Sequence, residues 1–313
     1  MSAAAERLRT FLVDWPDIAV VEVREAAGST PREAGSWMLV SAGAIFGTIG
    51  GGQLEFMAID RARQMIAAGP TTDLLDIPLG PEIGQCCGGR VRIDIAVADT
   101  ELRAAIPQRI LAEEAMQPHV YLFGSGHVGH ELALALALLP LNVTVVETRA
   151  EALDGLPPSV TSLLTPVPEE VVRGAPAGSA FVVLTHDHAL DFLIVAEALK
   201  RSDAAYVGMI GSKTKRATFR SWYLREAGGA DADLDRLVSP IGGDRLRDKR
   251  PAVIAALAAA EIATALLGQV REPSSPLSPI GGMSEGVEIS FTGRRARQSD
   301  EGPRKPRKAR RLA

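Results

Sequence analysis

The sequence predicts an α/β protein in which an N-terminal α+β domain is followed by a Rossmann-type domain with a parallel sheet. In the second half of the chain, apolar strand-like runs alternate with helical segments, which is typical of a parallel sheet covered by helices on both faces. In the first half, strand-like runs follow one another closely around glycine-rich turns. A G-x-G-x-x-G motif at residues 124–129 stands between a strand and a helix.

The first half predicts a domain over residues 1–106 that contains both helices and strands. Residues 18–24 (IAVVEVR) are rich in β-branched side chains, which favour a strand. Three glycines at 50–52 precede a helical segment. The predicted elements are helices over 4–15 and 53–68, strands over 18–24, 73–78 and 90–98, and a hairpin of 37–40 with 44–48.

The second half predicts a polar, helical linker over residues 107–118 and a Rossmann-type domain over 119–270. Pro251 near the start of the last apolar helix is compatible with helix geometry, because proline is tolerated in the first turn. The predicted strands lie in VYLFGSG, NVTVVETR, SAFVVLTH and AYVGMIGS, and the predicted helices run to 139, over 189–201 and over 249–267.

Composition limits the class of protein and its location. Apolar residues make up 46% and charged residues 23% of the chain, which is typical of a soluble globular protein. No stretch approaches 18 uncharged apolar residues and the N-terminus predicts no signal peptide, so no membrane partner is expected. The two cysteines are adjacent and cannot form a disulfide framework. A cytoplasmic location is therefore expected.

Residues 271–313 predict a disordered basic tail. Within it, residues 293–313 contain nine Lys or Arg and two acidic residues, whereas the whole chain has a net charge of −4. Gly, Pro and Arg dominate this segment and it lacks apolar periodicity, which favours a solvated chain. Nonspecific contact with an acidic partner is the alternative, and no specific nucleic-acid partner is expected.

Residues 121–149 predict the opening βαβ unit of the Rossmann domain. Gly124 permits a tight turn, Gly126 lets the backbone approach a phosphate, and Gly129 lets the helix lie close to the strand. The helix that follows would direct its free N–H groups at a bound phosphate. A Rossmann domain that holds no dinucleotide is the alternative interpretation.

Two polar residues of this unit are candidate ligand contacts. Glu147 ends the second strand, 18 residues after Gly129, near the spacing of about 20 expected for the acid that binds a ribose hydroxyl. His127 occupies a variable position of the motif and is either a ligand contact or a solvated loop histidine.

Two further segments should meet this turn, because ligands of an open α/β sheet bind beyond the carboxyl ends of the strands. His186 and His188 could ligate a metal, although no third ligand has a recognisable spacing. Asp187 between them could orient an imidazole or simply cap the following helix. Ser212 and Lys213 lie in GSKTKR, whose amides, hydroxyls and cations suit a phosphate or form an ordinary basic turn.

The first domain contains its own candidate residues. Cys86 and Cys87 are flanked by glycines, and adjacent cysteines close only a strained ring, so a structural disulfide is not expected. Thiolates are soft donors for transition metals and for sulfur transfer, although both side chains could instead be small buried residues. Arg32, in Gly28-Ser29-Thr30-Pro31-Arg32, and the segment Gly51-Gly52-Gln53 are compatible with anion binding or with glycine-dependent turns.

Taken together, these segments resemble the XdhC/CoxI family. GTIGGGQLE and GQCCGG are the most specific of them, and the resemblance covers about residues 15–268. The matching segments, in the family's order, are 28–32, 47–55, 84–89, 123–129, 185–189, 209–216 and 239–242.

The resemblance implies a molybdenum-cofactor chaperone with no catalytic turnover of its own. Such proteins bind the molybdopterin form of the cofactor and support exchange of an oxo ligand for a sulfido ligand, with a cysteine desulfurase as sulfur source. They then deliver the cofactor to the molybdenum subunit of xanthine dehydrogenase. The resemblance implies that Cys86 and Cys87 hold molybdenum or relay sulfur, and that Arg32, the triple glycine, the Rossmann turn and Ser212-Lys213 bind the pterin phosphate. We expect this cofactor between the two domains.

Other functions remain open on the sequence alone. The Rossmann unit, Glu147 and the histidines His186 and His188 are compatible with an NAD(P)-dependent oxidoreductase, and a nucleotide could occupy the Rossmann site. A sulfurtransferase with a persulfide on Cys86 or Cys87 is a third hypothesis. Apolar, Ala-rich helices such as residues 251–267 could pack between the subunits of a homodimer.

Overall fold

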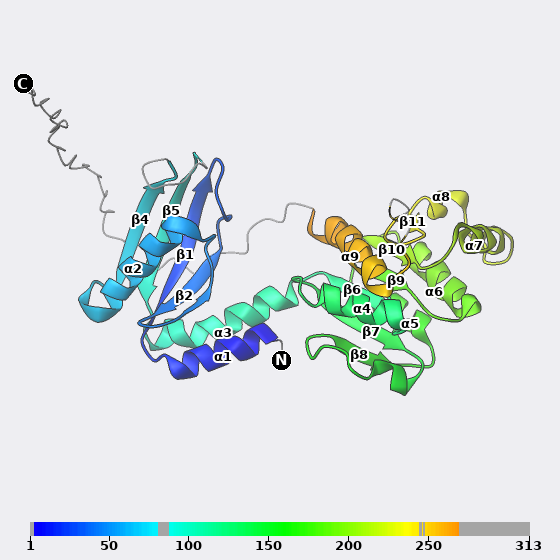
Figure 1. Cartoon of the computed structure of the whole chain (residues 1–313), viewed down its shortest axis with the longest axis horizontal. Coiled ribbons are helices and arrows are strands. Elements are labelled where there is room, and N and C mark those ends of the chain that lie inside the picture. Colours follow the sequence, from blue (N-terminus) through cyan, green and yellow to red (C-terminus); the bar gives the residue numbers. More distant parts are fainter. Residues whose placement is uncertain (1–2, 81–87, 244–245, 247, 269–313) are drawn as a thin grey trace, which may run out of the picture.

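The computed structural model describes residues 3–80, 88–243, 246 and 248–268, which form two lobes, each built on its own sheet (Figure 1). The first sheet is antiparallel and the second is parallel, which confirms the predicted fold class. The expected tail over 271–313 lies outside the described residues. Within the described part of the chain, no helix is both long and apolar enough to span a membrane.

The first lobe has three layers. Its five-stranded sheet has the order β3-β2-β1-β5-β4, with α2 on one face and α1 and α3 on the other. The alternating side chains of the strands feed two separate cores, one under each helical layer. The elements are α1 (Ala3–Asp14), β1 (Ile18–Ala27), β2 (Trp37–Ser41), β3 (Ile45–Gly47), α2 (Gly52–Ala68), β4 (Thr72–Pro78), β5 (Arg90–Val97) and α3 (Thr100–Ala115).

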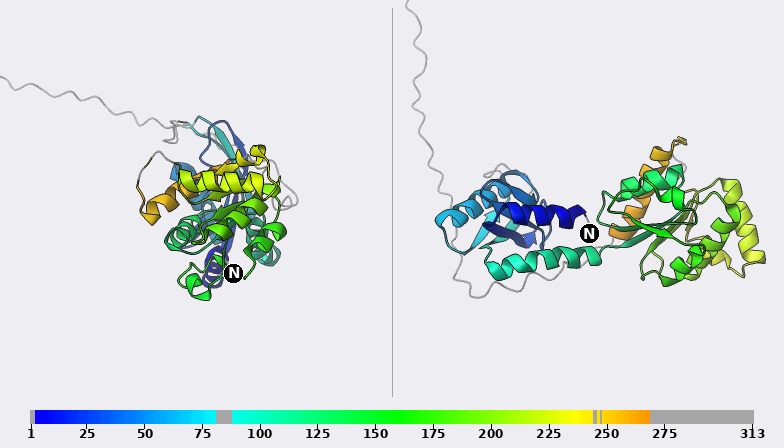
Figure 2. Two further views of the ribbon diagram at one scale, coloured as in Figure 1. Left: turned by 90° about the vertical axis from the view of Figure 1, so that its right-hand side faces the viewer. Right: turned by 90° about the horizontal axis from the view of Figure 1, so that it is seen from below.

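Helix α3 leaves the first lobe and leads directly into the second (Figure 2). The sequence predicted a linker helix from residue 107, but the helix begins at Thr100 because the Asp99 carboxylate accepts a hydrogen bond from the Leu102 amide at 2.8 Å and caps it. Ile106 and Ile110 pack in the core of the first lobe, so only the C-terminal part of α3 leads away from it.

A buried arginine fixes α3 to the first sheet. The Arg109 guanidinium donates to both carboxylate oxygens of Glu22 on β1, at 2.9 Å each, and to Glu113 at 3.0 Å. It also stacks 4.9 Å from the ring centroid of Trp37 on β2. At the other end of α3, the Asn142 side chain donates to the carbonyls of Glu114 and Gln117 at 2.9 and 3.2 Å. The helix is therefore bonded to both lobes.

The second lobe is a doubly wound parallel sheet with the strand order β11-β10-β9-β6-β7-β8. The chain moves outward from β6 to β8, then returns to β9 beside β6 and moves outward in the other direction, so the switch point lies between β6 and β9. The elements are β6 (His119–Phe123), α4 (His127–Leu136), β7 (Asn142–Glu147), η2 (Ala150–Leu153), β8 (Thr161–Leu164), α5 (Pro168–Gly174), β9 (Ala180–Val183), α6 (His188–Lys200), β10 (Tyr206–Met209), α7 (Lys213–Arg225), α8 (Asp231–Leu234), β11 (Leu237–Val238) and α9 (Pro251–Leu267).

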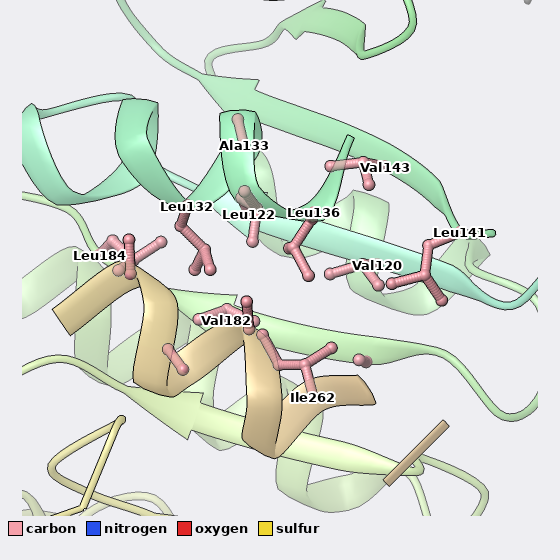
Figure 3. Close-up of a cluster of buried hydrophobic side chains, with 14 of the residues drawn as sticks. Val120, Leu122, Leu132, Ala133, Leu136, Leu141, Val143, Val182, Leu184 and Ile262 are labelled. Atoms are coloured by element: carbon pink, nitrogen blue, oxygen red, sulfur yellow. The ribbon is translucent and has the colours of Figure 1, made fainter. Parts of the chain in front are cut away.

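Helices α4 and α9 cover one face of this sheet, and α5, α6 and α7 cover the other. Leu132 and Leu136 of α4 meet Ile262 of α9 above the strand residues Leu122 and Val182 (Figure 3). This packing on both faces leaves the edge at the carboxyl ends of the strands for loops.

The strands at the two edges of the second sheet were not predicted from the sequence. All four residues of β8 are exposed, so its side chains do not alternate between core and solvent. Strand β11 has two residues and pairs only with β10. The short helices α5 and α8 were missed as well, because seven and four residues are too few to show a helical repeat.

We predict that Arg109→Met lowers the free energy of unfolding of the first lobe by about 3–5 kcal/mol, because it leaves the Glu22 carboxylate buried without its partner. Urea denaturation followed by fluorescence measures this, since Trp15 and Trp37 lie in the first lobe. Arg24→Met is the control, because its pair with Asp94 is longer, at 3.4 Å, and partly exposed, and should cost less than about 1 kcal/mol. Equal effects of the two substitutions would contradict the prediction.

Candidate functional site

The glycines of the turn after β6 have different surroundings. Gly124 and Gly129 are needed for packing, whereas Gly126 faces open space. A Cβ on Gly129 would lie 2.1 Å from the Gly124 carbonyl oxygen, and one on Gly124 would lie 2.9 Å from the backbone of Leu184. A Cβ on Gly126 would meet nothing within 4 Å. Gly126 is also the N-cap of α4 and provides no side-chain hydrogen bond. The first amides of α4, beginning with that of the exposed His127, therefore lie beside open space.

Glu147 braces this turn from the end of β7. Its carboxylate is 5% exposed and accepts hydrogen bonds from the amides of Ser125 at 3.1 Å and Thr148 at 2.8 Å. Burial opposes ionisation, but these amides and the Arg149 guanidinium outweigh it and lower the pKa of the Glu147 carboxyl below its ordinary value. The carboxylate that the spacing suggested for a ribose is thus already bonded within the protein.

Ser125 carries an unsatisfied hydroxyl inside the same turn. Its side-chain oxygen is buried and has no hydrogen-bond partner among the described residues. Buried hydroxyls normally have partners, so this atom fits a ligand oxygen placed against the turn.

The loop after β9 lies across the switch point from the glycine turn. Asp187 caps α6 by accepting a hydrogen bond from the Ala189 amide at 2.8 Å, which is the capping role that the sequence left open. His186 and His188 are exposed. In the described part of the chain, no three His, Cys, Asp or Glu residues are grouped as a metal site.

A buried ion pair links this loop to α7, and the sequence did not reveal it. Asp191 of α6 is fully buried and accepts a hydrogen bond from the Thr185 hydroxyl at 2.6 Å and from the Thr185 amide at 3.1 Å. Its other carboxylate oxygen binds the Lys215 ammonium, whose side chain is 8% exposed. Lys215 therefore has a structural partner. Ser212 is exposed and caps α7 by accepting a hydrogen bond from the Lys215 amide at 3.2 Å, and Lys213 is exposed at the start of the same helix. The only sequence signal was a carboxylate in the first turn of an apolar helix.

Three glycine-rich loops of the first lobe meet at one corner. A Cβ on Gly89 would lie 2.4 Å from the Ser29 carbonyl oxygen, and one on Gly50 would lie 2.6 Å from Pro31. The segments 28–32 and 47–53 and the end of the loop before β5 are therefore in close contact, with Arg32 exposed beside them.

Glu55 organises the triple-glycine segment. Its carboxylate accepts hydrogen bonds from the Thr48 hydroxyl at 2.5 Å, the Ile49 amide at 2.9 Å and the Gly51 amide at 3.1 Å. Part of the anion nest suggested by the sequence is thus filled by the protein's own carboxylate. Gly52 and Gln53, which begin α2, are exposed and are not bonded to Glu55 in this way.

Cys86 and Cys87 lie outside the described residues. The two ends of their loop are described, and they are bonded to each other. The Leu79 amide donates to the Gly89 carbonyl and the Gly88 amide donates to the Leu79 carbonyl, each at 2.7 Å. The loop with the two cysteines therefore begins and ends at the corner where the glycine-rich segments meet.

The corner of the first lobe and the glycine turn of the second lobe are two clusters of candidate residues. Each cluster lies at the edge of its sheet that is away from α3. The corner of the first lobe lies at the start of β5, whereas α3 follows the end of that strand. The glycine turn follows the end of β6, whereas α3 leads into its start (Figure 1). The expectation that one cofactor lies between the two domains stays a prediction, and within one chain both of these places lie away from the connecting helix α3.

Comparisons with known proteins agree with the motifs. Residues 120–262 match the XdhC Rossmann domain, and residues 17–78 match the XdhC and CoxI family. The YqeB protein of Escherichia coli (strain K12), described as uncharacterized, is 27% identical over 234 residues, which are 72% of this chain and 39% of that protein. The chain thus spans about two fifths of the length of this relative.

A solved structure shares the fold. The crystal structure of a xanthine dehydrogenase from Bacillus halodurans superposes with a TM-score of 0.69 and 18% identity, over 88% of this chain and 98% of that one. At this identity the similarity concerns the fold alone. The two family matches, which cover both lobes, lead to one conclusion: the chain belongs to the XdhC and CoxI family.

Proposed function

We propose that this protein is a xanthine dehydrogenase accessory protein that binds molybdenum cofactor in its molybdopterin form. In this proposal it supports sulfuration of the cofactor, with a cysteine desulfurase as sulfur source. It then delivers the cofactor to the molybdenum subunit of xanthine dehydrogenase and catalyses no turnover of its own. The observation that carries the proposal is the corner of the first lobe, where the ends of the Cys86-Cys87 loop meet the two other glycine-rich segments.

The glycine turn of the second lobe fits a phosphate. It combines an unpartnered, buried Ser125 hydroxyl with an open approach over Gly126 and the amides that begin α4. A helix N-terminus with free amides favours an anion. We assign the pterin phosphate to this turn, with His127 at its rim.

The corner of the first lobe fits the metal end of the cofactor. Thiolates of Cys86 and Cys87 would be soft ligands for molybdenum or carriers of sulfur. Arg32 is exposed at this corner and would offset the negative charge of the cofactor. When bound, the cofactor supplies the molybdenum whose oxo ligand is exchanged for sulfur. The residues of this chain hold it and keep it available.

A homodimer belongs to this proposal. The two clusters lie at edges away from α3, so one cofactor reaches both only if the first lobe of one chain faces the second lobe of its partner. The alternative function, an NAD(P)-dependent oxidoreductase, is supported by the complete βαβ unit. It is weakened by Glu147, whose buried carboxylate is bonded to Ser125 and Thr148 rather than available to a ribose.

We predict that the protein co-purifies with molybdenum and a pterin when it is expressed in a host rich in molybdenum cofactor. Metal analysis and fluorescence of the oxidised pterin measure this. Cys86→Ala/Cys87→Ala should reduce the bound molybdenum at least several-fold, because the soft ligands are removed. Retention of the cofactor at the wild-type level in this variant would exclude the cysteines as ligands. Binding of NAD(P)H without any bound pterin would favour the oxidoreductase.

A matched pair of glycine substitutions tests the phosphate site. Gly126→Ala should leave the thermal midpoint unchanged or slightly raised, because its φ of −67° suits alanine and its Cβ meets nothing. The same methyl group would obstruct the approach of a phosphate and should weaken cofactor binding roughly tenfold. Gly129→Ala should instead destabilise the second lobe by roughly 3 kcal/mol or more, because its Cβ would collide with Gly124.

Thermal unfolding and cofactor titration separate these two effects. If Gly126→Ala kept full affinity for the cofactor, the phosphate would not bind at this turn. If Gly129→Ala were as stable as the wild type, the packing of α4 described above would be contradicted.

A further inference from the structure

A second concave site lies away from the glycine turn, at the outer strands of the second sheet. The cavity has a volume of about 610 Å³ and lies between α7, the loop after β11 and α9. Volumes of this size are typical of small-molecule sites. The polar side chains that line it are Lys213, Arg216, Arg220, Ser239 and Glu261.

The wall of this cavity contains a cation whose partners are neutral. The Arg216 guanidinium donates to the backbone carbonyls of Ser239 at 3.3 Å and Leu234 at 3.5 Å. Among the described residues no carboxylate pairs with it. Arg220 shares its charge with Asp231 at 2.7 Å. The N-terminal end of α7 contributes a further partial positive charge.

Among the described residues that line the cavity, Glu261 provides a carboxylate, and the loop that forms the opposite wall is bonded to it. Glu261 of α9 accepts hydrogen bonds from the Gly242 amide at 2.8 Å and from the Tyr206 hydroxyl at 3.1 Å. Burial and the neighbouring carboxylate raise the pKa of the Tyr206 hydroxyl, which keeps it protonated as a donor. Glu261 therefore holds the loop that contains Gly242 in place, and the two donors partly compensate the charge of the Glu261 carboxylate.

A buried hydroxyl in the same wall has no partner. Ser239 is 6% exposed, and its side-chain oxygen forms no hydrogen bond within the described part of the chain. An unpaired buried hydroxyl destabilises the fold, so such groups are rare unless a ligand or water completes their hydrogen bonds. This hydroxyl lies beside the Arg216 guanidinium, which bonds the carbonyl of the same residue.

We propose that this cavity binds the phosphate group of a small organic phosphate. Arg216 would provide charge-assisted donors and Ser239 the hydroxyl donor, while Ala217, Val238 and Pro240 provide an apolar wall for the organic part. The proposal is independent of the cofactor function, because it requires neither the glycine turn nor the cysteine loop.

The test uses the full chain and calorimetric titration with pyrophosphate, with inorganic phosphate and with guanosine monophosphate. Arg216→Met should weaken the binding of pyrophosphate at least tenfold, because it removes a charge-assisted donor. Arg225→Met is the matched control: it removes the same charge from the last turn of α7, where Arg225 donates hydrogen bonds to Ser221 away from the cavity, and should leave the affinity unchanged. Tighter binding of the nucleotide than of pyrophosphate would show that the apolar wall takes a ring.

Ser239→Ala gives a readout that a purely structural role would not produce. It removes an unpaired buried hydroxyl, so the thermal midpoint should stay the same or rise, while the affinity for pyrophosphate falls several-fold. Gly126→Ala should leave this binding intact. Loss of binding in Gly126→Ala but not in Arg216→Met would place the anion at the glycine turn and overturn the proposal. Absence of pyrophosphate binding, or equal loss in Arg225→Met, would overturn it as well.

Discussion

The arrangement of the molecule depends on the buried guanidinium of Arg109. Its bidentate bond to Glu22 and its stacking on Trp37 fix α3 across the first sheet, where the guanidinium has lost most of its contact with water. A buried charge keeps its partner, because separating the two would leave an uncompensated ion. Asn142 is bonded to the other end of α3, so the helix is attached to both lobes. Because α3 follows the end of β5 and precedes the start of β6, the opposite edge of each sheet is free for binding.

Glycines in the shared motifs therefore have two distinct physical roles. At Gly129 and Gly89 a side chain would collide with backbone atoms, so glycine is required for the loops to pack. At Gly126 and Gly51 a side chain would meet nothing within 4 Å, so packing requires glycine at neither position. The φ of Gly126 also suits other residues. Gly51, with a φ of 77°, is required by its backbone conformation instead. Gly126 is thus the position at which neither packing nor the φ angle requires glycine, which is consistent with the phosphate site proposed above.

Sequence patterns predicted the parts of the fold in which local and tertiary signals agree. The βαβ unit at 121–149 has an apolar strand, a glycine turn and a helix with one apolar face, and each was found in place. Strand β8 could not be predicted, because its side chains are exposed and only pairing with β7 defines it. The pair of Asp191 with Lys215 joins residues 24 positions apart, so only the fold brings them together. The contacts of Glu55 are more local. Glu55 lies four residues after Gly51, so its carboxylate reaches the amides of the preceding loop.

In the part of the chain that the structure describes, two buried hydroxyls have no hydrogen-bond partner, those of Ser125 and Ser239, and both lie at the same edge of the second sheet. One follows β6 beside the switch point, and the other follows β11 at the end of the sheet. Nearby buried polar groups such as Glu147 and Asp191 are bonded within the protein, so this edge is not simply poorly packed. Because an unpaired buried hydroxyl destabilises the fold, its presence at two strand ends is consistent with ligands or water that complete the bonding. The carboxyl edge of a doubly wound sheet is also where loops can admit such ligands without disturbing the core.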